Sequence, residues 1–309
     1  MTFPSRKLPN WLRSGWQFSR PHTIIGTTLS VWSIYTLAVM NSDQAWDLLP
    51  VAMGAWIACL AGNVYIVGLN QILDIPIDQI NKPHLPLAAG EFTVPQAWII
   101  VISMGLVSLG LSIWQGMILL GVISLSLLIG TAYSLPPIRL KRYPFWSALC
   151  ILGVRGIIVN LGLFWHFQAR LNQPLAITNL VWALTGFVVI FTVAIALCKD
   201  IPDLEGDRQF QIATLTVQLG TKAVFQMTLG VLTLAYGGLI LTSFVVNLGV
   251  NLGLFVGVHL LLWVILWLQA RRVELNDITS LTHFYQFIWK LFFWEYILLP
   301  VLAVTNHWR

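Results

Sequence analysis

The chain has 309 residues, of which 57% are hydrophobic and only 9% charged, with a net charge of +5. Soluble domains carry about 25% charged residues, so this composition excludes a water-soluble globular protein and indicates one that crosses a membrane several times. The excess of basic residues does not indicate nucleic-acid binding, because Lys and Arg are distributed as membrane topology requires. The three cysteines lie in apolar stretches without metal-ligand spacing and are interpreted as packing residues: Cys59, Cys150 and Cys198.

The chain reads as a short N-terminal segment followed by a series of apolar stretches. Residues 1–22 are basic and aromatic, which is typical of a segment at the membrane interface. Each apolar stretch is near the roughly 20 residues that a helix needs to cross the hydrocarbon. We predict nine transmembrane helices, at residues 23–41, 47–69, 94–113, 117–134, 145–167, 176–198, 223–246, 250–270 and 285–304. No signal or transit peptide is evident, and we expect residues 1–309 to form one domain.

Lys and Arg divide unequally between the two ends of these predicted helices. Thirteen of the 17 lie in the N-terminal segment and in alternate loops, at residues 70–93, 135–144, 199–222 and 271–284. The other side has only Arg170 and Arg309, while Arg155 and Lys290 fall inside predicted helices. By the positive-inside rule, the first set of loops faces the cytoplasm and the C-terminus lies opposite.

Two acidic segments follow the second and the sixth predicted helix: NQILDIPID, which begins at Asn70, and KDIPDLEGD, which begins at Lys199. Carboxylates four residues apart lie on one face of a helical turn. The segments align so that their aspartates fall in equivalent pairs, Asp74 with Asp203 and Asp78 with Asp207. We therefore predict an all-α membrane protein with a parallel internal repeat of four-helix units around a central cavity, and the ninth helix outside the repeat.

Four carboxylates gathered at one membrane face repel one another unless cations neutralise them. Such a cluster suits Mg²⁺, which binds carboxylates together with phosphate oxygens and keeps some of its waters. Asn70 and Asp74 are four residues apart, so their directions differ by only about 40° on a helix and both face one ligand. Basic residues occur in the same loops. Together these groups describe a diphosphate site, and its membrane location indicates a diphosphate with a hydrophobic tail.

These segments resemble motifs of the UbiA family of intramembrane prenyltransferases. NQILDIPIDQINKPHLPLAAGE resembles the family's first motif, N-x-x-x-D-x-x-x-D, and KDIPDLEGD resembles the second, D-x-x-x-D. TAYSLPPIRLKR resembles the segment between the family's fourth and fifth helices. The resemblance covers essentially the whole chain. The family's first motif often starts with Asn-Asp, whereas Gln71 follows Asn70 here, so one potential metal oxygen is absent.

The resemblance implies a reaction in which an allylic diphosphate ionises and an electron-rich aromatic ring attacks it. It implies Asp74, Asp78, Asp203 and Asp207 as the catalytic carboxylates, which with Asn70 would hold Mg²⁺ and the diphosphate. The candidate cations for the diphosphate are Lys141, which matches the family motif, Arg142, Lys199 and Arg208. Lys82 is possible but has no assigned role.

The chain most resembles family members that transfer a phytyl group from its diphosphate to homogentisate with loss of CO₂, a step of tocopherol synthesis. We expect a cyanobacterial protein of the plasma or thylakoid membrane, because no transit peptide is evident. The homogentisate carboxylate needs a cation, and a charged side chain within a membrane helix indicates function. The candidate acceptor-binding residues are Arg155, Arg20, His22, Asn63 and Asn160.

Alternatives exist within the family and outside it. Within it, the donor is a solanesyl or geranylgeranyl diphosphate, or the acceptor is another aromatic compound or a chlorophyllide. From a different class, a membrane transporter would also have many helices and an internal repeat. Transporter sites, however, lie near the bilayer midplane, whereas these acidic groups gather at one face. The sequence gives no indication of an oligomeric state.

Overall fold

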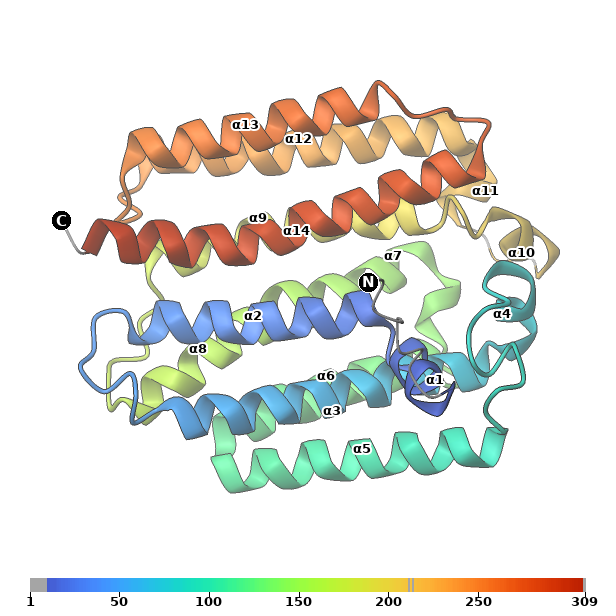
Figure 1. Cartoon of the computed structure of the whole chain (residues 1–309), viewed down its shortest axis with the longest axis horizontal. Helices are drawn as coiled ribbons and strands as arrows, with labels where there is room; N and C mark the ends of the chain where they lie inside the picture. The colour runs from blue at the N-terminus through green and yellow to red at the C-terminus, as the bar shows by residue number, and fades with distance from the viewer. Residues whose placement is uncertain (1–9, 211, 213, 308–309) are drawn as a thin grey trace, which may run out of the picture.

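The computed structural model describes residues 10–210, 212 and 214–307, and within these it contains helices and no strands. The long helices run side by side, and three short helices lie together at one end of the bundle: α4 (Ile75–Asn81), α10 (Leu204–Gln209) and α11 (Leu215–Leu219) (Figure 1). The loop between α2 (Pro21–Val39) and α3 (Leu49–Leu73) and the end of α14 (Ile278–His307) lie at the opposite end (Figure 1). The all-helical membrane fold predicted from the composition is therefore confirmed.

The first half of the chain forms α1 (Asn10–Phe18), α2 (Pro21–Val39), α3 (Leu49–Leu73), α4 (Ile75–Asn81), α5 (Val94–Gln115) and α6 (Met117–Ser134). A 3₁₀ turn, η1 (Leu140–Arg142), follows. One long helix then comprises α7 (Pro144–Leu152), a π-helical segment η2 (Gly153–Ile158) and α8 (Val159–Arg170). The remaining helices are α9 (Asn179–Lys199), α10 (Leu204–Gln209), α11 (Leu215–Leu219), α12 (Thr221–Val245), α13 (Leu252–Ala270) and α14 (Ile278–His307).

Eight helices in the described part of the chain are long and apolar enough to cross a membrane, one fewer than the nine predicted. The difference is α2, the first predicted span, which has 19 residues but includes four threonines and two serines. Together with His22 near its start, these hydroxyl groups keep α2 out of that set. Even so, α2 lies inside the bundle and packs against α3, α8 and α14 (Figure 1).

The internal repeat is visible in the backbone. The most extensive helix contacts are those of α3 with α5 and of α9 with α12, which are equivalent pairs in the two halves. Each acidic segment forms a short helix directly after the first helix of its pair. Asp74 and Asp203 each precede their short helix, and Asp78 and Asp207 are each its fourth residue.

Each acidic segment contains a proline just after the membrane helix ends. Proline lacks an N–H and clashes with the preceding turn, so a helix rarely continues through it. Pro76 follows the end of α3, and the chain turns at Asp74, whose carbonyl accepts a hydrogen bond from the Asp78 N–H at 2.8 Å. Pro202 lies between α9 and α10 in the same way. The carboxylates are therefore at the ends of the spans, near water.

Helices in lipid associate through close packing and hydrogen bonds. In the second half, Phe191 of α9 packs on Tyr236 of α12 and on Phe292 of α14, with ring centroids 6.2 and 5.8 Å apart. His259 of α13 contacts Glu295 of α14 through Nε2 and Oε1 at 3.1 Å, and both side chains are fully buried. This polar pair fastens the outer helix α13 to the bundle.

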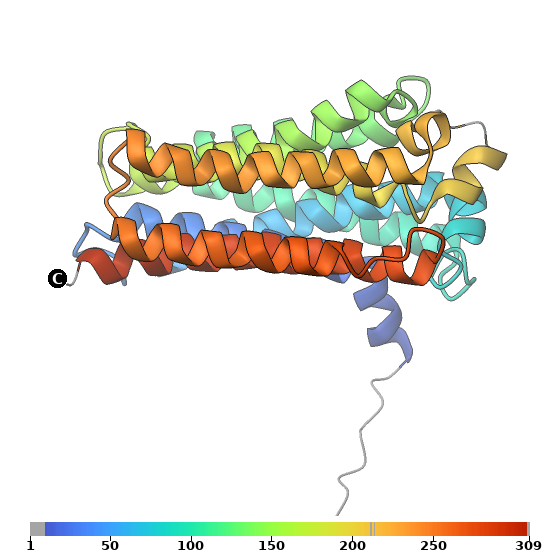
Figure 2. The ribbon, with the colours of Figure 1, turned by 90° about the horizontal axis from the view of Figure 1, so that it is seen from above.

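The helix α1 lies at the same end as α4 and projects from the bundle (Figure 2). Trp11 and Trp16 of α1 are exposed. Exposed tryptophan is typical of segments at the membrane–water boundary, so this geometry suits the predicted interfacial role. That role stays a prediction, and residues 1–9 of the predicted segment lie outside the described residues.

Candidate active site

Two adjoining cavities open at the end of the bundle that carries α4 and α10. The mouth cavity, of about 510 Å³, is lined by Arg139, Lys141, Arg142, Asp200 and Asp207, among others. The inner cavity, of about 350 Å³, is lined by residues that include Arg20, His22, Asn63, Asp78, Arg155 and Trp289. Tyr133, Lys199 and Asp203 line both. The acidic segments therefore border a space that leads from the polar end into the membrane region.

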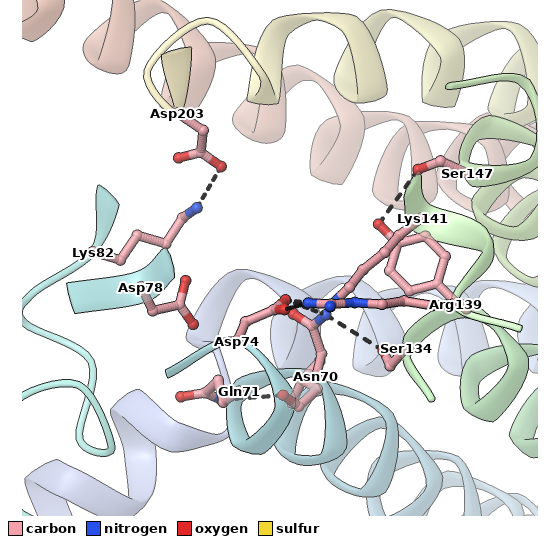
Figure 3. Close-up of polar contacts among 12 residues, drawn as sticks. Asn70, Gln71, Asp74, Asp78, Lys82, Ser134, Arg139, Lys141, Ser147 and Asp203 are labelled. Atoms are coloured by element: carbon pink, nitrogen blue, oxygen red, sulfur yellow. Dashed lines mark hydrogen bonds and ion pairs between the residues drawn. The ribbon is translucent and has the colours of Figure 1, made fainter. Parts of the chain in front are cut away.

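Asp74 is the centre of a polar cluster (Figure 3). Its Oδ1 accepts a hydrogen bond from Arg139 Nη2 at 2.9 Å, and its Oδ2 pairs with Lys141 Nζ. Asn70 Nδ2 donates to the same Oδ2 at 2.9 Å. The structure thus brings together Asn70, Asp74 and Lys141, and it adds Arg139, which the sequence analysis missed. The only signal for Arg139 was its place in the basic loop before Lys141.

Lys82 joins the two acidic segments. It follows α4, and its Nζ forms an ion pair with Asp203 Oδ2, just before α10 (Figure 3). The sequence analysis assigned Lys82 no role, because nothing in the local pattern shows which distant carboxylate it meets. In the structure it holds the second segment against the first, and both Lys82 and Asp203 line the inner cavity.

Asp78 has a buried carboxylate with an unsatisfied oxygen. Within the described residues its Oδ2 accepts no hydrogen bond, and Arg20 Nη2 lies 3.8 Å from it. Burial raises the pKa of Asp78, while Arg20 and Lys82 act in the opposite direction. A buried carboxylate oxygen without a partner is unfavourable unless a cation reaches it.

Asp207 lies among other acids in the second segment. Burial, together with the charges of Asp203 and Asp200, raises its pKa to about 7. Lys199 Nζ lies 3.6 Å from Asp200 Oδ1 and compensates part of this charge. A divalent cation placed beside these carboxylates would favour their ionised form and lower the pKa of Asp207 again.

The carboxylates of the two acidic segments can bind Mg²⁺ only if other ligands complete the coordination shell of the metal. Among the described residues, no group of three or more His, Cys, Asp or Glu side chains is close enough to hold a metal by itself. Asp74 and Asp203 are paired with basic side chains instead. Mg²⁺, however, commonly uses one or two carboxylates, substrate phosphates and water. The unsatisfied oxygen of Asp78 and the acidic surroundings of Asp207 are therefore suitable for a metal that arrives with a diphosphate.

The other predicted phosphate-binding cations differ in position. Lys199 lines both cavities, and its Nζ lies 3.3 Å from the hydroxyl of Tyr133. Arg142 lines the mouth cavity. Arg208 is exposed and is not among the residues that line either cavity, so the structure does not bring it to the site.

Four of the five candidate acceptor-binding residues line the inner cavity: Arg20, His22, Asn63 and Arg155. Asn63 Nδ2 also donates to Thr23 Oγ1 at 2.9 Å. Asn160 is placed differently, because its side chain is fully buried and used in helix packing. It donates to the Gly156 carbonyl at 3.1 Å and accepts from the Tyr296 hydroxyl at 2.9 Å.

A membrane-embedded cavity with carboxylates and cations at its polar end suits a transferase that acts on lipid-like diphosphates. The sequence matches the UbiA prenyltransferase family over residues 27–291, and the chain belongs to that family. The protein is thus a multi-pass membrane prenyltransferase. This confirms the family that the motifs predicted and excludes the transporter alternative.

Curated relatives and solved structures agree with this assignment. The chain is 50% identical to a homogentisate phytyltransferase of Synechocystis sp., over 94% of this chain and 95% of the relative. It is 40% identical to a homogentisate geranylgeranyltransferase of Triticum aestivum, over 96% and 74%. Its fold is similar to a UbiA homolog from Archaeoglobus fulgidus bound to GPP and Mg²⁺, with a TM-score of 0.63, 16% identity and coverage of 93% and 99%.

Proposed function

We propose that this protein transfers a phytyl group from phytyl diphosphate to homogentisate, with loss of CO₂, to form the methylphytylbenzoquinol used in tocopherol synthesis. The observation that carries the proposal is the similarity, along nearly the whole chain, to proteins named for homogentisate prenylation. The cavities support it, because they join a polar end suited to a diphosphate with an inner space lined by cations and aromatic rings.

The polar end would bind the diphosphate. We assign Mg²⁺ to Asn70, Asp74, Asp78, Asp203 and Asp207, and when bound it would supply positive charge to the phosphate oxygens. Lys141, Arg142 and Lys199 would contact the diphosphate directly. Arg139 and Lys82 join this set, because both lie beside motif carboxylates. Arg208, the fourth predicted cation, is exposed on α10 and would have to reach the diphosphate from that side.

The bond changes follow from this division of the site. The C–O bond between the allylic carbon and the diphosphate breaks, and its electron pair stays with the diphosphate, whose charge the basic residues stabilise. A ring carbon of homogentisate then forms a C–C bond to the allylic carbon and loses a proton. The acetate carboxylate leaves as CO₂, and the methylene carbon that held it takes up a proton, which balances the proton that the ring loses. The released diphosphate carries the remaining negative charge. Aromatic walls exclude water from the cation.

We also propose that the acidic end faces the cytoplasm of a cyanobacterial cell, in the plasma or thylakoid membrane. Arg139, Lys141 and Arg142 lie at this end, as do Arg271 and Arg272 after α13, whereas Arg170 lies at the other (Figure 1). The positive-inside rule assigns the more basic end to the cytoplasm.

The proposal is tested with purified protein in detergent. Homogentisate is offered with phytyl, geranylgeranyl or solanesyl diphosphate, and 4-hydroxybenzoate and a chlorophyllide are offered as other acceptors. We expect the product mass of methylphytylbenzoquinol, with phytyl diphosphate as the preferred donor. A product formed only from another acceptor, or a preference for a longer or geranylgeranyl chain, would contradict the proposed substrates.

A further inference from the structure

Arg155 occupies an unusual place in the helix Pro144–Arg170. It lies in the π-helical segment η2, and π-turns within α-helices are rare and occur frequently at functional sites. It is eleven residues after Pro144, which places it about 16 Å along the helix from that end. A charged side chain at this depth is costly and is normally paired with an opposite charge.

Within the part of the chain that the structure describes, no carboxylate forms an ion pair with Arg155. The guanidinium carbon lies 4.8 Å from the ring centroid of Trp289 and 5.6 Å from that of Phe292, so Arg155 is held by two aromatic faces. Among the described residues, the acids of the inner cavity pair with other cations. Asp78 pairs with Arg20, and Asp203 pairs with Lys82. Arg155 thus presents a positive charge to the cavity without a carboxylate partner.

A second donor lies beside it. The indole Nε1–H of Trp289 is buried and makes no hydrogen bond of normal distance and angle within the described structure, with the Tyr285 hydroxyl as the acceptor beside it. An indole N–H can only donate, so it has capacity for a better-placed acceptor in the cavity. Arg155 and Trp289 both line the inner cavity, and Arg155 also lines a smaller pocket of about 100 Å³ that continues beyond it. The unpaired charge of Arg155 therefore favours an anionic ligand, and the Trp289 N–H is placed to donate to the same ligand.

We infer that Arg155 and Trp289 bind the carboxylate of the aromatic acceptor. This inference rests on the proposed function, because it concerns the second substrate of the same site. A carboxylate matches a guanidinium and an N–H donor, while the ring of an aryl acid fits among aromatic side chains. The diphosphate has its own cations in the mouth cavity. The two substrates would thus be held by separate charges, with the carboxylate deeper in the membrane and the reacting ring between.

The test compares two acceptors that differ in the carboxylate. Methylhydroquinone has a methyl group where homogentisate has its acetate group, and prenylation gives the same product. Arg155→Gln should raise KM for homogentisate at least ~10-fold, as expected for a lost hydrogen-bonded charge, and should abolish the preference for homogentisate over methylhydroquinone. KM for phytyl diphosphate should change less than about twofold, because the inference assigns Arg155 to the acceptor and the mouth-cavity cations to the diphosphate.

Two further variants serve as a control for lost charge and as a separate test of the Trp289 donor. Lys290→Gln removes a positive charge from the exposed position next to Trp289, and it should leave both KM values unchanged. Trp289→Phe deletes the N–H donor but keeps an aromatic ring, and it should weaken homogentisate binding less than Arg155→Gln does. If Arg155→Gln fails to fold, Arg155→Lys takes its place, and we expect an intermediate KM because the charge stays but the forked geometry is lost.

Binding without turnover separates this inference from the proposed function. Homogentisate alone should raise the unfolding temperature of the wild type in detergent but not that of Arg155→Gln. An active wild type, with unchanged homogentisate KM and acceptor preference in Arg155→Gln, would overturn the inference and leave the function standing. If the wild type does not use homogentisate, stabilisation by other aryl carboxylates that disappears in Arg155→Gln would support the inference. Stabilisation that persists would overturn it.

Discussion

The side chain of Asn81 accepts a hydrogen bond from the backbone N–H of Gly206, with Oδ1 and N 2.9 Å apart. Asn81 is the last residue of α4 and Gly206 lies in α10, so this bond joins the two acidic segments directly. An added Cβ at Gly206 would lie 2.3 Å from Asn81 Oδ1, so a side chain there requires Asn81 or α10 to move. Together with the pair of Lys82 and Asp203, the bond sets the spacing of the carboxylates.

Gly206→Ala should therefore lower kcat at least ~10-fold without unfolding the bundle, because the added methyl group forces α10 away from α4. Asn81→Ala should act in the same direction, since it leaves the Gly206 N–H without its acceptor. The measurement is kcat in detergent together with the unfolding temperature. Gly230→Ala in α12 is the matched control, because an added Cβ there meets nothing within 4 Å. Equal activity of the two glycine variants would contradict this role for Gly206.

The motif carboxylates should be needed for turnover but not for folding. Asn in place of Asp74, Asp78, Asp203 or Asp207 should lower kcat by about 10²–10³-fold, as loss of a charged transition-state contact does. Asp43→Asn, at an exposed position at the opposite end of the bundle, is the control. The readout is the rate at saturating Mg²⁺, with membrane insertion checked separately. Near-normal rates in all four motif variants would contradict the assigned site.

Sidedness can be tested by cysteine labelling. In a background without the three native cysteines, Gln209→Cys lies in α10 and Asp43→Cys lies in the loop between α2 and α3, and both positions are exposed. The positive-inside rule predicts that a membrane-impermeant maleimide labels only Asp43→Cys in intact cells, and Gln209→Cys only after the membrane is opened. The reverse pattern would place the acidic segments on the outside.

The buried pair of His259 and Glu295 should matter for stability. His259 Nδ1 lies 2.6 Å from the Phe255 carbonyl, which only accepts, so this nitrogen carries a proton. His259→Ala would leave Glu295 buried alone and should destabilise the protein by about 3–5 kcal/mol. Glu295→Gln keeps a hydrogen-bonding partner of the same shape and should cost much less. Equal unfolding temperatures for the two variants in detergent would show that the pair does not hold α13 on α14.

The sequence predicted features that depend on local pattern. The fifth predicted span, 145–167, forms the helix Pro144–Arg170, because the length of an apolar run must match the bilayer. The equivalence of the two acidic segments was also predictable, because it depends only on spacing. Asp74 and Asp203 each precede a short helix, so the helical turn assumed for the paired carboxylates is present within the regions predicted as loops.

Contacts between distant segments could not be predicted in this way. Periodicity does not show that Lys82 meets Asp203, or that Arg139 reaches Asp74 while Arg208 stays exposed. Asn160 has the same residue type and the same kind of span position as Asn63, yet only Asn63 lines the inner cavity. These differences depend on how the helices pack, which a single sequence does not specify.

The most direct test of the proposed reaction follows the carboxyl carbon. Homogentisate labelled at its carboxyl group is incubated with phytyl diphosphate and purified protein, with Mg²⁺ or with a chelator. We predict labelled CO₂ and unlabelled methylphytylbenzoquinol in equal amounts, formed only when Mg²⁺ is present. A prenylated product that keeps the label, or product formation that continues in the chelator, would contradict the proposed function or its metal site.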